Sequence, residues 1–201
     1  IKRTNSKLTT PETIELHKLL DSAAKQDTKY FIVEVSSQAL KYGRVMDISF
    51  DYGAFLNFSK DHISPIEHPT LEDYFNSKLK IFDQSKTALI NPEMKEIKEI
   101  EEYISHSDVE RVLPFKKAFD IVEHPASLEF KTDIYGKEEN ITVGIGGGYN
   151  VSNAVLAITI AEDIGVSVEN IKAGLENLVV TGRMEHYRIG NNVDIIIDAA
   201  H

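Results

Sequence analysis

Three side chains of complementary chemistry stand out in the sequence: the carboxylate of Glu34, the imidazole of His62 and the amine of Lys78. Glu34 lies near the end of an apolar segment, His62 follows a second one, and Lys78 lies on a predicted helix. Magnesium prefers oxygen ligands and bridges phosphate oxygens, and imidazole is a less usual partner for it. We interpret the three residues as a magnesium–phosphate site.

The segments around these residues are predicted to alternate between strands and helices. Apolar runs predict strands at 30–35, 52–58, 87–90 and 193–198. Helical spacing and caps predict helices that begin at the Thr9–Glu12 capping box and at Asn91, and others at 69–83, 150–165 and 167–177. This alternation favours an α/β fold with a mostly parallel sheet flanked by helices. Ligands gather beyond the carboxyl ends of such strands, so Glu34, His62 and Lys78 should meet at one edge.

A second, smaller sheet is predicted in the middle of the chain. Residues 127–133 and 140–144 alternate apolar and polar side chains, and Tyr135-Gly136 between them suits a hairpin connection. We therefore expect a small antiparallel sub-sheet at about 110–145, which Gly146–Gly148 brings to an end.

Each chemical residue also has an ordinary structural interpretation. Glu34 could form a buried salt bridge or cap the turn at Ser36 and Ser37. His62 could belong to a hydrogen-bond network, and Lys78 could be a surface lysine. The combination, rather than any one residue, favours the metal site.

Composition limits the possible functions. The chain has 201 residues, a formal net charge of −10 and no cysteine, which excludes disulfides and thiolate metal sites. The acidic balance argues against nucleic-acid binding. No apolar run is long enough for a membrane span and no signal pattern is present, so we expect a cytoplasmic protein with no membrane partner. The chain begins without methionine and stops directly after a strand, so we expect a fragment of a longer protein.

Several short motifs occur together in one order along the chain. They are Thr9-Thr-Pro-Glu12, Glu34-Val-Ser-Ser-Gln-Ala-Leu40, Asn57–His62, Tyr74–Lys78, Asn150-Val-Ser-Asn153, Gly182-Arg-Met-Glu185 and Asp198-Ala-Ala-His201. With them, the whole chain resembles the central, ATP-binding domain of the Mur ligases, closest to the MurE type. The domains that precede and follow it in the family are expected to lie outside residues 1–201.

The resemblance implies an activity and its cofactors. Mur ligases use ATP and Mg²⁺ to convert a carboxylate of a UDP-N-acetylmuramoyl peptide into an acyl phosphate. An amino acid then attacks it to form an amide, a step of peptidoglycan precursor synthesis. Glu34 and His62 match residues that serve magnesium, and Lys78 matches the lysine that is carbamylated.

The same resemblance implies two binding sets. Four residues match positions that hold the muramyl peptide: Thr9, Thr10, Ser36 and Arg44. Four others match nucleotide-side positions: Asn150, Asn153, Arg183 and Asp198. His201 matches the end of the last motif. A helix cap would by itself explain the threonines, and an N-cap with a first-turn polar residue would explain the asparagines.

Some features depart from the family pattern. The chain has no Gly-rich phosphate loop, and Gly146–Gly148 has no lysine after it. The stretch Asp61–His68 is two residues longer than usual, Tyr42 replaces a glutamine found in some MurE enzymes, and Ala199 replaces a tyrosine. We therefore expect the chain to be inactive alone. The departures also leave open whether the substrate is the standard muramyl dipeptide.

Two other functions remain. One is a related ligase, such as a folylpolyglutamate or cyanophycin synthetase. The other is a non-catalytic module that binds a UDP-muramyl peptide without turnover. The added amino acid cannot be read from this chain.

Overall fold

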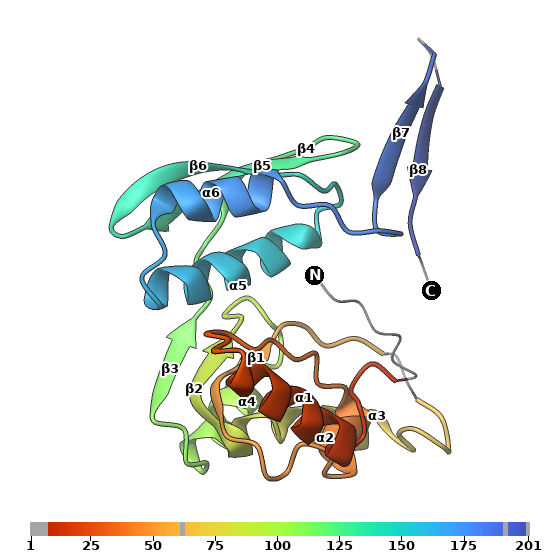
Figure 1. Ribbon diagram of the computed structural model, residues 1–201, viewed down its shortest axis with the longest axis vertical. Coiled ribbons are helices and arrows are strands. Elements are labelled where there is room, and N and C mark those ends of the chain that lie inside the picture. Colours follow the sequence, from red (N-terminus) through yellow and green to blue (C-terminus); the bar gives the residue numbers. More distant parts are fainter. Residues whose placement is uncertain (1–7, 61–62, 191–192, 200–201) are drawn as a thin grey trace. The chain divides into compact units, whose positions relative to one another are not determined.

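The computed structural model describes residues 8–60, 63–190 and 193–199. The chain divides into two compact units, residues 1–112 and residues 113–201 (Figure 1). His62 and His201 lie outside the described residues. Each unit is described by itself below.

Unit 1 is built on a short parallel sheet. β1 (Phe50–Phe55) pairs in parallel with β2 (Ser85–Ile90), and β3 (Arg111–Pro114) is third in order. Phe55 is opposite Ile90, so both strands end at the same edge. The accompanying helices are α1 (Thr13–Lys25), α2 (Ser37–Lys41), α3 (Leu71–Leu79), the 3-10 turn η1 (Phe82–Gln84) and α4 (Ile97–Ser105). The prediction of a parallel α/β sheet is confirmed.

The core of unit 1 surrounds these strands. Phe55, Phe82 and Ile100 are at most 1% exposed and belong to one apolar cluster with Leu16 of α1. Ala88, Leu89 and Ile90 are all buried, so β2 is covered on both faces. That burial matches the unbroken apolar run predicted for a central parallel strand.

Two helix starts differ from the prediction. α1 begins at Thr13, and its N-cap residue Glu12 makes no side-chain cap. The predicted capping box at Thr9 is therefore wrong, because Thr9 lies in a bend before the helix. α4 begins at Ile97 rather than near Asn91. Asn91 Oδ1 instead accepts a hydrogen bond from the Glu93 amide at 3.0 Å, which caps a turn.

The apolar segment at 30–35 is not a strand. It pairs with no strand in the part of the chain that the structure describes, and Tyr30, Phe31 and Ile32 are exposed. Only Val33 and Val35 pack against the core of unit 1. The prediction of a buried strand carrying Glu34 is wrong, because a strand also needs a neighbour to complete its backbone hydrogen bonds.

Unit 2 contains the predicted antiparallel sub-sheet. β4 (Phe119–Glu123), β5 (Leu128–Ile134) and β6 (Lys137–Val143) form a sheet, with α5 (Asn150–Asp163) and α6 (Val168–Glu176) packed on it (Figure 1). Tyr135 and Gly136 have φ of 53° and 75° and form the two-residue turn between β5 and β6. The predicted helices 150–165 and 167–177 are confirmed to within two residues at each end.

One glycine controls how closely α6 approaches the sheet. A Cβ added at Gly144 would lie 2.3 Å from the backbone oxygen of Glu176 and 2.9 Å from that of Leu178. The Gly144 amide also donates to the Leu175 carbonyl at 2.9 Å. Only glycine permits this contact, which holds the end of β6 against the end of α6.

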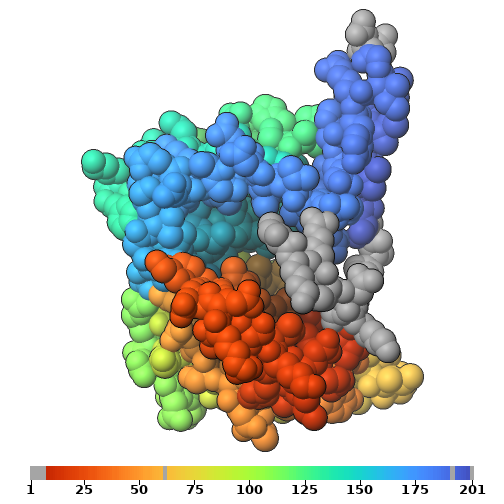
Figure 2. Space-filling view, viewed as in Figure 1, coloured from red at the N-terminus to blue at the C-terminus, as the bar shows by residue number. Residues whose placement is uncertain are grey.

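The last two strands form an exposed hairpin. β7 (Glu185–Ile189) pairs antiparallel with β8 (Val193–Ile197). The hairpin forms a narrow arm that is blue in Figure 2. Ile195, Ile196 and Ile197 in it are 38–47% exposed. The prediction of a strand near 193–198 is confirmed, but its predicted burial is wrong, because β7 is its only sheet neighbour among the described residues. No helix in the described part of the chain is long and apolar enough to cross a membrane.

Candidate active site

The amine of Lys78 is held at the carboxyl edge of the parallel sheet. Lys78 lies on α3, and its Nζ donates to the backbone oxygen of Asn57, just beyond β1, at 2.7 Å. The same nitrogen lies 4.9 Å from the ring centroid of Phe55 and 5.4 Å from that of Tyr74. Two aromatic walls and one carbonyl therefore fix the position of this amine.

The surroundings of Lys78 also change its chemistry. Burial lowers the pKa of Lys78 below the ordinary lysine value. The neutral amine is the nucleophilic form, so a lowered pKa increases the fraction that can react with carbon dioxide. The direction of this shift favours carbamylation.

Glu34 does not contact Lys78. The Glu34 side chain is exposed, and no hydrogen bond or ion pair joins the two residues within the described ranges. The backbone oxygen of Glu34 instead accepts from the Thr10 hydroxyl at 2.9 Å. The convergence of Glu34, His62 and Lys78 stays a prediction, since His62 lies outside the described residues.

Thr10 and Ser36, two of the predicted muramyl-peptide residues, do lie together. The Ser36 amide donates to Thr10 Oγ1 at 2.8 Å, and the two hydroxyl oxygens lie 3.4 Å apart. Thr10 is fully buried, whereas Ser36 caps α2 by accepting from the Ala39 amide at 3.2 Å. Both hydroxyls therefore shape the turn before α2.

Thr9 and Arg44 lie on either side of this turn. Thr9 is exposed directly before Thr10. Arg44 follows α2, its amide donates to the Ala39 carbonyl at 2.8 Å, and its Nε lies 3.5 Å from Glu12 Oε1. A guanidinium suits phosphate or carboxylate ligands, and here it pairs with the carboxylate of Glu12.

The sequence prediction missed a buried polar network close to these residues. The ring of His68 is fully buried, with Nδ1 2.7 Å from Asp73 Oδ2 and Nε2 2.8 Å from Ser37 Oγ. Lys41 Nζ donates to the same Asp73 oxygen at 2.7 Å. These hydrogen bonds, first from Lys41 and then from His68, lower the pKa of Asp73. The capping spacing of Thr70 and Asp73 was the one sequence signal that could have pointed to it.

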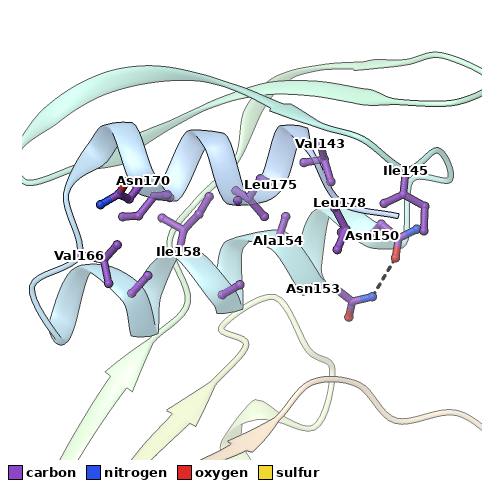
Figure 3. Close-up of a pocket in the computed structure, with 14 residues that line it drawn as sticks. Val143, Ile145, Asn150, Asn153, Ala154, Ile158, Val166, Asn170, Leu175 and Leu178 are labelled. Atoms are coloured by element: carbon purple, nitrogen blue, oxygen red, sulfur yellow. Dashed lines mark hydrogen bonds between the residues drawn. The ribbon is translucent and has the colours of Figure 1, made fainter. Parts of the chain in front are cut away.

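In unit 2, Asn150 and Asn153 stand at one end of an apolar groove. The groove, about 370 Å³ in volume, lies along α5 and α6 and has Asn170 toward its other end (Figure 3). Asn150 is buried and its Nδ2 donates to the Gly146 carbonyl at 2.8 Å. Asn153 is exposed and donates to Asn150 Oδ1 at 3.0 Å. An apolar slot with amides at its end suits a flat, partly polar ring.

Arg183 and Asp198 meet at the base of the β7–β8 hairpin. Arg183 donates from a terminal guanidinium nitrogen to the Ala199 carbonyl at 2.7 Å. The Asp198 carboxylate accepts from the Met184 amide at 3.3 Å, and the Ala199 amide donates to the Gly182 carbonyl at 2.7 Å. The structure therefore brings these two predicted nucleotide-side residues into one local cluster.

The described residues do not by themselves make a metal site. They include no group of three or more histidine or acidic side chains able to hold an ion. An unmodified Lys78 has only hydrogen-bond donors. Carbamylation would give it anionic oxygens, so Lys78 suits magnesium only with that modification.

Comparison with known proteins defines the class of this chain. The model of the Mur ligase middle domain matches residues 1–161. The UDP-N-acetylmuramoyl-L-alanyl-D-glutamate–L-lysine ligase of Streptococcus agalactiae serotype V is 38% identical over 98% of this chain. The corresponding 2,6-diaminopimelate ligase of Clostridium perfringens is 35% identical over the whole chain. A solved structure of a 2,6-diaminopimelate ligase shares the fold, with a TM-score of 0.81 and 23% identity over 94% of this chain and 41% of its own.

The chain belongs to the Mur ligase family. Its relatives at 35–38% identity are MurE-type ligases, as the sequence motifs predicted. The chain spans 40% of the length of the first relative and 43% of the second.

Proposed function

We propose that residues 1–201 are the central domain of a MurE-type ligase. The intact protein would use ATP to join an amino acid to a UDP-N-acetylmuramoyl peptide through an acyl phosphate. The observation that carries the proposal is the environment of Lys78, whose amine is fixed at the carboxyl edge of a parallel sheet and has a lowered pKa. Relatives that are named as ligases of this kind support it.

The role we assign to Lys78 is that of a magnesium ligand after carbamylation. The neutral amine attacks carbon dioxide, a C–N bond forms, and the proton lost from nitrogen passes to solvent. Bound magnesium would neutralise charge on the phosphate groups. Glu34 and His62 are the further magnesium ligands that we propose.

The turn before α2 is the proposed muramyl-peptide site. Thr10 and Ser36 fix its backbone, while Thr9 and Arg44 offer a hydroxyl and a guanidinium to the ligand. A bound carboxylate must be held at a fixed distance from the transferred phosphoryl group, because small misplacements are costly in rate. The many backbone contacts of this turn support such a role.

Nucleotide binding is assigned to residues of unit 2. Asn150 and Asn153 stand at the end of the α5–α6 groove, and Arg183 and Asp198 lie together at the hairpin base. We assign the asparagines to the nucleobase side, and Arg183 and Asp198 to the phosphate and ribose. We also propose that the intact protein acts in the cytoplasm, where ATP is abundant.

The direct test uses the full-length gene product. It is incubated with ATP, magnesium and UDP-muramyl dipeptide, and ADP release and the amide product are measured with L-lysine or diaminopimelate as the amine. A parallel assay supplies folate and glutamate. Amide formation with the muramyl peptide alone supports the proposal.

Other outcomes contradict it. Turnover with folate alone would make the protein a folylpolyglutamate-type ligase. Tight binding of the muramyl peptide with no ADP release, at any amine supplied, would make it a binding module.

A further inference from the structure

The buried residue His68 joins three segments of unit 1. Its Nε2 lies 2.8 Å from Ser37 Oγ at the start of α2, and its Nδ1 lies 2.7 Å from Asp73 Oδ2 on α3. Its own backbone oxygen accepts from the Ser64 amide at 3.0 Å. The His68 side chain therefore connects α2 and α3, and its backbone oxygen holds the loop that precedes α3.

The directions of these hydrogen bonds follow from the chemistry of the partners. An ionised carboxylate only accepts hydrogen bonds, so Nδ1–H donates to Asp73. In the neutral ring, Nε2 is then an acceptor, and the Ser37 hydroxyl donates to it. Lys41 donates to Asp73 at 2.7 Å and to the Glu67 carbonyl at 3.1 Å, which completes the network.

The network lies between the elements that carry the two proposed sites of unit 1. Ser37 follows Ser36, which belongs to the proposed muramyl-peptide turn, whereas Asp73 is on the same helix as Lys78. His68 is fully buried and its ring lies 5.0 Å from that of Tyr74, one of the two rings around the Lys78 amine. A polar connection between the elements that carry the two proposed sites in unit 1 therefore runs through this ring.

We infer that His68 is a positioning residue for the ligase reaction: through Ser37 and Asp73 it sets the muramyl-peptide turn relative to the helix that carries Lys78. The inference rests on the proposed function. His68 itself touches no reacting atom. Its hydrogen bonds fix Ser37 relative to Asp73, and a buried, fully bonded polar network makes such an arrangement rigid.

The arrangement of Ser37, His68 and Asp73 also has the order of a nucleophile, a base and an orienting acid. A positioning network and a nucleophile make different predictions about Ser37. A nucleophilic serine reacts covalently with a fluorophosphonate probe, whereas a serine that only donates a hydrogen bond does not. The positioning role predicts no labelling.

The test compares variants of the full-length gene product in steady-state assays. His68→Phe keeps an aromatic ring and removes both hydrogen bonds, and the exposed His17 on α1 supplies the matched control His17→Phe. Ser37→Ala removes one hydrogen bond with little change of volume, and Ser37→Thr restores the hydroxyl. If His68→Phe does not fold, Ser37→Ala and Ser37→Thr still test the inference.

We expect His68→Phe and Ser37→Ala to lower kcat/KM for the muramyl peptide by about tenfold or more, as misplaced reactants do. The KM for ATP should change by less than about twofold, because neither variant removes a group that we assign to nucleotide binding. A twofold change corresponds to less than the free energy of one hydrogen bond. Ser37→Thr should recover most of the loss, and His17→Phe should match the unmodified protein. General destabilisation of the protein would not lower kcat/KM for the muramyl peptide while leaving the KM for ATP unchanged.

Three results would overturn the inference. In the first, the variants change the KM for ATP and for the muramyl peptide equally, or match the control. In the second, Ser37 is labelled by the fluorophosphonate. In the third, the unmodified protein has no ligase activity, which would contradict the proposed function as well. The assay of the unmodified protein distinguishes this third result from the first two.

Discussion

The hydroxyl oxygen of Thr10 lies 2.8 Å from the amide nitrogen of Ser36, although 26 residues separate them in sequence. The same oxygen donates to the Glu34 carbonyl at 2.9 Å, and Thr10 is fully buried. One side chain therefore satisfies two backbone groups of a segment that belongs to no strand. The Thr10 side chain therefore holds residues 34–36 in place, although they pair with no strand among the described residues.

Thr10→Val should destabilise unit 1 by about 1–3 kcal/mol, because valine has the same shape but leaves a buried amide and carbonyl unpaired. Hydrogen exchange at the Ser36 amide should become faster. Thr10→Ser should retain most of the stability, and Thr9→Val, at an exposed position, should change it by less than about 0.5 kcal/mol. Equal exchange at Ser36 in the Thr10→Val protein would contradict this assignment.

Lys78 provides a test of carbamylation that charge alone does not confound. Arginine keeps the positive charge but is never neutral, so it cannot form a carbamate. Lys78→Arg and Lys78→Met should therefore both lower ligase activity by at least about 100-fold, the loss typical of a removed electrostatic stabiliser. ADP release by the full-length gene product measures this.

The matched control for this experiment is Lys80→Arg, at the exposed end of α3. It should retain full activity. Intact mass measured in bicarbonate buffer should show one added carbon dioxide in the unmodified protein and none in Lys78→Arg. Full activity of Lys78→Arg would remove the carbamate from the mechanism.

Asp73 should make the stability of unit 1 depend on pH. Its pKa is lowered in the folded protein, first by the hydrogen bond from Lys41 and then by that from His68. The unfolded state then binds more protons than the folded state as the solution is acidified. The contribution of Asp73 is fully present above the ordinary aspartate pKa of about 3.9 and is lost as pH falls through its lowered value.

The measurement is a carboxyl-carbon titration by NMR together with unfolding at several pH values. Asp73 should titrate below the ordinary aspartate value of about 3.9. The stability difference between the unmodified protein and Asp73→Asn should shrink as pH falls. A constant difference down to acid pH would show that Asp73 does not act through its charge.

The sequence predicted best those elements whose signals are local. Helix α5 has a continuous apolar pattern and Gly165 with φ of 81° after it, and the β5–β6 hairpin has a Tyr-Gly turn. Each of these signals acts within a few residues and depends little on distant contacts, although the equally local capping pattern at Thr9 did not start a helix.

The errors about burial and the missed network have a common physical cause. Apolar residues at 30–35 and 193–198 indicated burial, but burial depends on what packs against a segment. The network of Ser37, His68 and Asp73 was missed for the same reason, since Ser37 and His68 are 31 residues apart. The family motifs found the predicted site residues, and spacing alone could not show which of them touch.

Asn150 and Asn153 are only three residues apart, yet they should respond differently to substitution. Asn150 is buried and holds the Gly146 carbonyl, so Asn150→Ala should destabilise the start of α5 by about 1–3 kcal/mol. Asn153 is exposed, and Asn153→Ala should leave stability unchanged while weakening ATP binding about two- to tenfold, the value of one hydrogen bond. Calorimetry on the full-length gene product measures both, with Asn170→Ala toward the other end of the groove as control. Equal weakening by Asn153→Ala and Asn170→Ala would mean that the nucleobase does not lie at the Asn153 end.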